Sequence, residues 1–134
     1  MIFIDTSAWY ALEVEDDVNH EQARKTLSQI GTGKLGIAIT TDYVLDETLT
    51  LLRSRRGLSD ALKFIGKIRK SQSVRVFWVN EGIFEKALSI FEKTGDKSWS
   101  FTDCTSFALM KDLSINEAFT FDNHFTEAGL QKLP

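Results

Sequence analysis

The chain has 134 residues, of which 43% are hydrophobic, and its net charge of −3 does not mark it as a general polyanion binder. This length predicts one domain, residues 1–134, with a core large enough to fold without cross-links, and the single cysteine, Cys104, excludes an internal disulfide. No apolar run approaches the ~20 residues of a membrane span and no basic segment opens the chain, so we expect a cytoplasmic protein without a membrane partner.

Strands and helices alternate in the first half of the chain. Ile2–Ile4 is a short, continuous apolar run, which is typical of a buried central strand. Gly57 follows an apolar helical pattern and is expected to end that helix. The expected elements are a strand over 2–4, a helix over 6–14, a helix that starts in a capping box over 19–22 and stops at Gly31, a strand over 36–40, a helix over 42–56 and a helix capped by Ser59.

The same alternation continues to the end of the chain. Ser100-Phe101-Thr102-Asp103 has the pattern of a capping box and predicts the start of a helix that ends near Leu113. Strands are expected over 74–79 and 117–121, with a helix from Glu81 to Gly95 between them and a fifth edge strand over 130–133. Strands that alternate with helices predict an α/β fold with a mostly parallel sheet and helices on both faces.

The apolar spacing also predicts which side chains face inward. Each helix is expected to bury the residues that recur at three- and four-residue intervals. The three tryptophans are expected mainly in the core. The inward positions are Ala23, Leu27 and Ile30 in the second helix, Leu62, Ile65 and Ile68 in the fourth, and Ile83, Ala87 and Phe91 in the fifth.

Four acidic residues differ from the other fifteen in where they stand. Asp5 and Asp122 follow expected strands, and Asp103 lies in the first turn of a helix. Glu47 lies within an apolar helix, where a carboxylate is seldom buried without a partner. Asp46, one position round the same helix, is the rival to Glu47. Each acid taken singly also has an ordinary explanation, as a helix cap, a turn residue or an edge position.

Together these acids predict a site for a divalent cation. In an open α/β sheet, ligands bind outside the carboxyl ends of the strands. Carboxylates gathered there would repel one another without a cation between them. A hard divalent cation prefers oxygen ligands and can take few carboxylates directly, so we expect Asp5 and Asp103 to bind it and Glu47 and Asp122 to act through water or a second ion. Such a site suits the hydrolysis of a phosphodiester.

The motifs that carry these acids resemble those of the PIN-domain family. In particular, the chain is similar to the VapC-like toxin ribonucleases of prokaryotic toxin–antitoxin modules, over essentially its whole length. The matching segments are Ile4-Asp5-Thr6-Ser7, Asp46-Glu47-Thr48, Ser100-Phe101-Thr102-Asp103-Cys104 and Thr120-Phe121-Asp122-Asn123-His124-Phe125.

This resemblance implies a fold, an activity and a set of site residues. The fold would be a PIN-like α/β/α sandwich with a central parallel sheet of four to five strands, and the activity that of a Mg²⁺- or Mn²⁺-dependent endoribonuclease. Asp5, Glu47 and Asp103 match the three core acids of the family and Asp122 its more variable fourth. Thr6, Ser7 and Thr102 fall where the family often places groups near the metal or the phosphate. The resemblance also implies a protein antitoxin and a homodimer.

The basic residues are concentrated in one segment. Residues 53–75 hold eight lysines and arginines against Asp60 alone, a net charge of +7, so the rest of the chain carries −10. The segment could bind RNA phosphates or simply form solvated helix faces. Trp99 could stack on an RNA base or belong to the core. His20 is expected at the surface, His124 in a structural loop role or at the substrate, and Cys104 in the core.

Other functions remain open from the sequence. The chain could be a non-catalytic module that binds RNA or a protein, or an RNA-processing nuclease without an antitoxin. A phosphatase of the haloacid dehalogenase type would also place Asp5 after the first strand. That family requires a second Asp two residues later, where this chain has Ser7.

Overall fold

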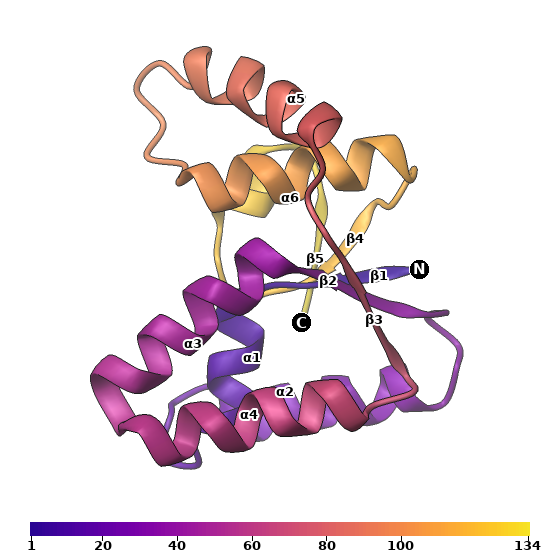
Figure 1. Ribbon diagram of the computed structural model, residues 1–134. Helices are drawn as coiled ribbons and strands as arrows, with labels where there is room; N and C mark the ends of the chain where they lie inside the picture. The colour runs from indigo at the N-terminus through magenta and orange to yellow at the C-terminus, as the bar shows by residue number, and fades with distance from the viewer.

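The computed structural model describes residues 1–134 and has one five-stranded parallel sheet in the order β3-β2-β1-β4-β5 (Figure 1). The sheet confirms the expected α/β fold, including the fifth edge strand. The strands are β1 (Ile2–Ile4), β2 (Ala38–Thr41), β3 (Val74–Phe77), β4 (Glu117–Phe119) and β5 (Gln131–Leu133). The helices are α1 (Thr6–Glu13), α2 (His20–Gly31), α3 (Asp42–Arg56), α4 (Leu58–Lys70), α5 (Glu81–Glu92), α6 (Phe101–Asp112) and α7 (His124–Glu127).

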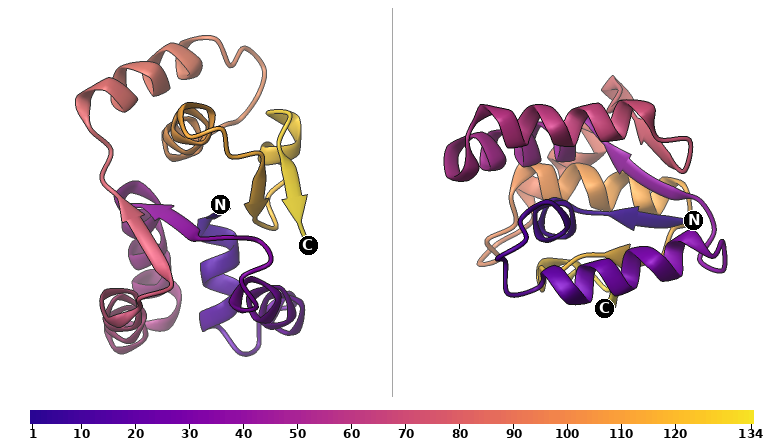
Figure 2. Two further views of the ribbon diagram at one scale, coloured as in Figure 1. Left: turned by 90° about the vertical axis from the view of Figure 1, so that its right-hand side faces the viewer. Right: turned by 90° about the horizontal axis from the view of Figure 1, so that it is seen from below.

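The helices form two layers around the sheet. In Figures 1 and 2, α5 and α6 lie on one side of it, and α1 to α4 lie on the other. The chain moves outward from β1 to β2 and β3, and then crosses back through α5 and α6 to place β4 on the other side of β1. The strand order therefore reverses between β1 and β4, and the crevice at such a switch point is where α/β folds bind ligands.

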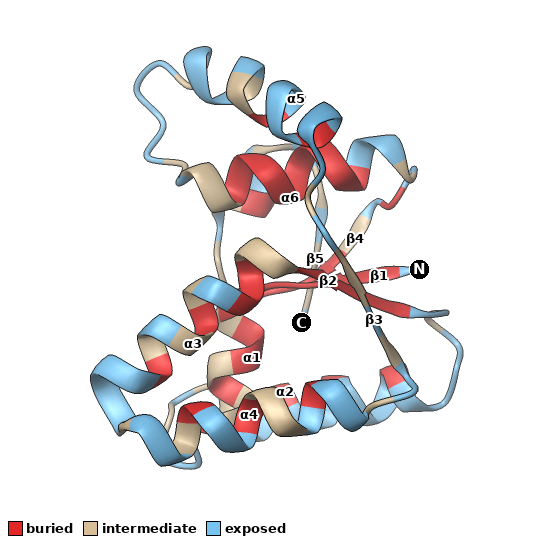
Figure 3. Ribbon diagram, viewed as in Figure 1, coloured by how far each residue is buried: buried red, intermediate tan, exposed pale blue.

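The core follows from the burial of the central strands. Ile2, Phe3 and Ile4 are completely buried, and β1 pairs with β2 on one side and with β4 on the other. Figure 3 shows β1 and α6 as almost continuously buried elements. Cys104, as expected, belongs to this core, and so does Trp9, whose indole N–H donates a hydrogen bond to Thr40 Oγ1 (3.3 Å).

The junction of α3 and α4 corrects one predicted boundary. Gly57 has φ +103° and ends α3, as predicted, because glycine adopts this conformation without strain. The same glycine is also the N-cap of α4, so the predicted cap at Ser59 is wrong: the cap lies two residues earlier, and the helix starts at Leu58. Leu62, expected inside, is 57% exposed. The fully buried face of α4 is formed by Ala61, Phe64 and Ile68.

Other differences concern exposed apolar residues and element ends. Trp78, expected in the core, is 77% exposed because β3 ends at Phe77, two residues before the predicted end. Leu27 and Phe91, both expected inside, are also exposed. Asn19 makes no side-chain capping bond, so the predicted capping box of α2 does not form. β4 is likewise shorter than predicted, and α7 has no counterpart among the predicted elements.

None of the seven helices combines the length with the apolar character needed to cross a membrane.

Candidate active site

The site is built at the carboxyl ends of β1 and β4. These neighbouring strands pair in register, with Ile4 opposite Phe119, so the residues that follow them meet at one edge of the sheet. The backbone N–H of Asp5 donates to the Phe119 carbonyl (3.1 Å), which brings Asp5 beside Thr120. The two chain segments that carry these residues are 115 positions apart and become neighbours only through the strand order.

Asp5 is the most buried of the four acids, at 4% exposure. Its Oδ2 accepts hydrogen bonds from Ser7 Oγ (2.9 Å), Thr120 Oγ1 (3.0 Å) and the Ser7 backbone N–H (3.3 Å), the last of which caps α1. None of these three bonds uses Oδ1. Asp5 therefore has one oxygen that is fixed by Ser7 and Thr120 and one that takes no part in these bonds.

Burial makes Asp5 a weaker acid than usual. The pKa of Asp5 is raised from 3.8 to about 6, mainly by desolvation and to a smaller extent by the charge on Asp103, while hydrogen bonds from Ser7, the Thr6 backbone and Thr120 oppose the rise. A cation beside Asp5 would favour its ionised form and reverse this effect.

Asp103 comes from α6 and is fixed by the predicted capping box. The Asp103 backbone N–H donates to Ser100 Oγ (3.0 Å), and the Ser100 backbone N–H donates to Asp103 Oδ2 (3.0 Å). The residue is 6% exposed and close enough to Asp5 to raise the pKa of that group. The first turn of a helix favours a negative charge, which suits the carboxylate that a cation requires.

Asp122 and His124 complete one side of the site. Asp122 Oδ1 accepts the backbone N–H of His124 (2.9 Å), and Asp122 is itself held by Thr120 Oγ1, which accepts the Asp122 backbone N–H (3.0 Å). The His124 ring reaches Asp103 and Asp122 at once, with its Nδ1 2.9 Å from Asp103 Oδ2 and 3.3 Å from Asp122 Oδ2. Ligand atoms of these three residues all lie within 4.8 Å of one another, an arrangement able to hold a metal ion.

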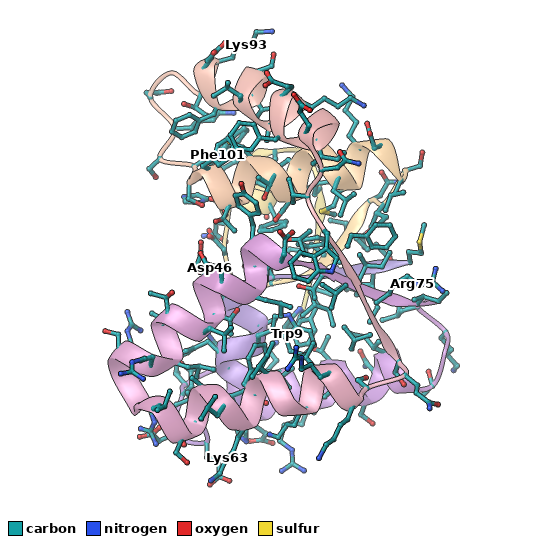
Figure 4. The ribbon with its side chains drawn as sticks, viewed as in Figure 1. Trp9, Asp46, Lys63, Arg75, Lys93 and Phe101 are labelled. Atoms are coloured by element: carbon teal, nitrogen blue, oxygen red, sulfur yellow. The ribbon has the colours of Figure 1, made fainter.

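Glu47 approaches from α3 and is half buried, whereas Asp46 is exposed. Figure 4 shows Asp46 at the surface of α3. Desolvation raises the pKa of Glu47; hydrogen bonds from the side chains of Thr6 and Thr102 oppose this, and the charges on Asp103 and Asp122 add to it. Glu47 thus lies within the electrostatic field of Asp103 and Asp122, whereas Asp46 is exposed to solvent.

The four acids lack a strong positive partner within the protein. No lysine or arginine forms a salt bridge with Asp5, Glu47, Asp103 or Asp122, although exposed acids elsewhere have such partners. His124 is the one basic side chain among them. Partial burial lowers the pKa of His124, but the hydrogen bond to Asp103 and the charges on Asp122, Asp103 and Glu127 raise it by more. A set of clustered carboxylate oxygens fits a hard divalent cation.

The predicted hydroxyl residues lie in the site. Ser7 and Thr6 contact Asp5 and Glu47 respectively, and the side chain of Thr102 contacts Glu47. The sequence interpretation missed Thr120, which is fully buried and binds both Asp5 and the backbone of Asp122. The sequence did offer a signal for Thr120: its hydroxyl directly follows an apolar strand and stands two residues before an acid.

Two other sequence interpretations have clear outcomes. Trp99 packs edge-to-face on Phe107, and its N–H donates to Glu127 Oε2 (3.0 Å), so the ring belongs to the fold. His20 is only half buried, and its Nδ1 lies 2.7 Å from the carbonyl oxygen of Ala11, so it ties α2 to α1 as well as reaching the surface.

The basic segment 53–75 occupies the end of α3, all of α4 and the start of β3. Lys67 and Arg56 use their charges in ion pairs with Glu13 and Asp16, and the guanidinium of Arg55 lies 5.5 Å from the centre of the Tyr10 ring. Lys63 of α4 and Arg75 of β3, both labelled in Figure 4, form no ion pair. A part of the positive charge therefore stays unpaired.

Comparison with known proteins gives one consistent family. A family model described as PIN domain matches residues 2–130. The 23S rRNA-specific endonuclease VapC20 of Mycobacterium tuberculosis is 37% identical over 129 residues, which covers 96% of this chain and 95% of the relative. A VapC ribonuclease of Archaeoglobus fulgidus is 27% identical over 124 residues, 92% of this chain and 78% of the relative.

Solved structures agree with the sequence relatives. The crystal structure of M. tuberculosis VapC20, described as a sarcin–ricin loop cleaving toxin, has a TM-score of 0.89 and 35% identity over 97% of this chain and 96% of the other. The crystal structure of FitAcB from Neisseria gonorrhoeae has a TM-score of 0.70 at 17% identity, over 100% of this chain and 97% of the other, and shows a shared fold.

Proposed function

This chain belongs to the PIN-domain family, and from that premise we propose that it is a divalent-metal-dependent endoribonuclease of the VapC-like toxin type. The observation that carries the proposal is the meeting of Asp5, Glu47, Asp103 and Asp122 at the switch point between β1 and β4. A binding module has no need to bring four carboxylates together with no lysine or arginine among them, since ionised groups this close destabilise the fold. A catalytic cation supplies the missing positive charge.

The residues are suited to Mg²⁺ or Mn²⁺. Asp5 Oδ1 and the second oxygen of Asp103 are the available direct ligands, and Glu47 and Asp122 act through water or a second ion. The ion, when bound, activates a water and neutralises charge on the scissile phosphate. Ser7 and Thr120 hold Asp5 in place. Glu47 is only partly buried and keeps access to solvent, which suits a carboxylate that acts through water.

The substrate is RNA, and we propose the ribosomal class first. This choice rests on the relative at 37% identity, which is named as a 23S rRNA-specific endonuclease. The toxin role, a protein antitoxin partner, a homodimer and a cytoplasmic location follow from the likeness to VapC proteins. The unpaired lysines and arginines of segment 53–75 supply a non-specific attraction for RNA phosphates.

Cleavage of ribosomal RNA tests the activity. Purified protein, free of any partner, is incubated with ribosomes and with an isolated sarcin–ricin stem-loop, and primer extension maps the cut. We expect cleavage with Mg²⁺ or Mn²⁺, and none with EDTA. Asp5→Asn and Glu47→Gln should each lower the rate at least about 100-fold, a loss in the range expected for groups that bind or orient a catalytic ion.

Asp46→Asn is the matched control. It removes a carboxylate from the same helix, one position from Glu47, and should cleave like the wild type because Asp46 is exposed. Equal losses of cleavage rate in the Asp46 and Glu47 variants would show that the catalytic centre has been assigned wrongly. Intact RNA under all metal conditions, with tight RNA binding, would favour a non-catalytic module.

The partner and the oligomeric state need separate measurements. Growth arrest on expression, relieved by the product of an adjacent short gene that co-purifies with this chain, is expected for a toxin. A nuclease that leaves growth unchanged would indicate RNA processing instead. Light scattering after size exclusion should give a mass near twice the 15.2 kDa of one chain.

A further inference from the structure

His124 joins two of the four acids through a single ring nitrogen. Its Nδ1 is 2.9 Å from Asp103 Oδ2 and 3.3 Å from Asp122 Oδ2, while its Nε2 is 3.3 Å from the hydroxyl of Ser98. The backbone N–H of the same residue donates to Asp122 Oδ1 (2.9 Å). One residue therefore contacts both oxygens of Asp122 and one oxygen of Asp103.

The chemistry of the acceptors determines which ring nitrogen carries the proton. Ionised carboxylates only accept hydrogen bonds, so the nitrogen beside them has to donate. This requires the Nδ1–H form and leaves the lone pair of a neutral ring on Nε2, where the Ser98 hydroxyl can donate to it. The lone pair that a metal ion would need thus points away from the acids.

The two carboxylate oxygens of Asp103 differ in their hydrogen bonds. Oδ2 accepts from the Ser100 backbone (3.0 Å) and from His124, so it is held from two sides. Oδ1 takes part in neither bond and is the oxygen left for a cation. Without His124, a single capping bond would hold the carboxylate, which could then rotate.

We propose that His124 is a positioning residue, whose Nδ1–H holds the carboxylates of Asp103 and Asp122 in the orientation that binds the catalytic cation. It contacts neither the ion nor the RNA. The inference rests on the proposed metal-dependent activity, but the geometry that it claims exists in the metal-free protein. Residues that orient metal ligands in this way typically contribute 10–100-fold to metal affinity or activity.

Two amide variants separate the roles of the ring nitrogens. In His124→Asn the side-chain NH₂ takes the place of Nδ1–H, and in His124→Gln it takes the place of Nε2. We expect His124→Asn to bind Mn²⁺ within about 3-fold of the wild type by calorimetry, and His124→Gln to bind it about 10–100-fold more weakly. His20→Gln is the control for loss of a histidine, because His20 contacts the carbonyl of Ala11 rather than an acid.

Cleavage kinetics should follow the metal affinity. For His124→Gln we expect a lower kcat at low Mn²⁺ that recovers as Mn²⁺ is raised, with KM for RNA unchanged. Equal affinities in the Asn and Gln variants would overturn the proposal. A raised KM at saturating metal would show that His124 contacts the RNA, and ¹⁴N coupling from His124 in the electron spin resonance of bound Mn²⁺ would show that it is a ligand; either result overturns the proposal.

A measurement without metal or RNA keeps the proposal distinct from the proposed function. Long-range ¹H–¹⁵N spectra of the metal-free protein at pH 9, where the ring is neutral, should show His124 in the Nδ1–H form. The Nε2–H form would overturn the proposal even in an active enzyme. Conversely, a wild-type protein that binds no Mn²⁺ refutes the metal-dependent function, while the Nδ1–H form would still verify the contact with the acids.

Discussion

Asp5→Asn should stabilise the metal-free protein while it removes the activity. The substitution keeps the shape of the side chain, and the amide oxygen can accept the three hydrogen bonds that Oδ2 now accepts. What it removes is a charge that the fold has desolvated. The structure therefore predicts that the catalytic acid costs stability when no cation is bound.

The magnitude follows from the pKa of Asp5, which rises from 3.8 to about 6 in the folded protein. At about 1.4 kcal/mol per pKa unit, the ionised carboxylate costs about 3 kcal/mol relative to a neutral side chain. The folded protein holds the proton more tightly than the unfolded chain does. Stability from this group is therefore fully present below pH 3.8 and is lost as the pH rises to about 6.

Thermal unfolding in EDTA at pH 4 and at pH 7.5 measures this effect. At pH 7.5 the Asp5→Asn protein should unfold on the order of 10 °C above the wild type, and at pH 4 the two should nearly coincide. Adding Mg²⁺ at 100 times its dissociation constant should stabilise the wild type by about 2.7 kcal/mol and the variant by much less.

The control is Asp46→Asn, an exposed acid whose replacement should leave the unfolding temperature unchanged at both pH values. An Asp5→Asn protein no more stable than the wild type at pH 7.5 in EDTA would refute the reasoning. So would a difference of equal size at pH 4, because the effect would then not come from ionisation.

Three further predictions concern two residues that hold acids of the site in place and one exposed tryptophan. Thr120→Val removes the buried hydroxyl that binds Asp5 and should lower the free energy of unfolding by about 1–3 kcal/mol, and the cleavage rate with it; unchanged kinetics would mean that Ser7 alone positions Asp5. Ser100→Ala removes the cap of α6 and should cost about 1 kcal/mol in urea unfolding and weaken metal binding through Asp103, whereas a loss of stability alone would separate the cap from the site. Trp78→Ala should leave the free energy of unfolding within about 0.5 kcal/mol of the wild type, because the ring is 77% exposed, and a larger loss would contradict this placement.

The sequence alone predicted the kind of fold and the membership of the acid cluster. Local signals were enough for this: an apolar run before Asp5, a capping box at Asp103, and an apolar helix around Glu47 whose exposed neighbour is Asp46. Each of these signals is read within a few residues of chain. Gly57 is predictable for the same reason, because its backbone conformation is a local property.

Local signals did not predict which side of a broadly apolar element faces the core. In α4, two overlapping sets of apolar residues could face the core; Ala61 and Phe64 are buried, with the Phe64 ring against Trp9 of α1, and Leu62 is exposed. Trp78 shows the same limit: its ring would stabilise a core, but β3 lies at the edge of the sheet and ends before it. Which side of an element is covered depends on its neighbours.

Only the tertiary structure decided how the acids are held. The strand order places β4 beside β1, and this adjacency, which no local pattern encodes, brings Thr120 onto Asp5 across 115 residues. The short helix α7 then turns the ring of His124 back onto Asp103. The carboxylates can be recognised in the sequence because each stands out against its neighbouring residues. The hydrogen bonds that orient them join segments that meet only in the folded chain.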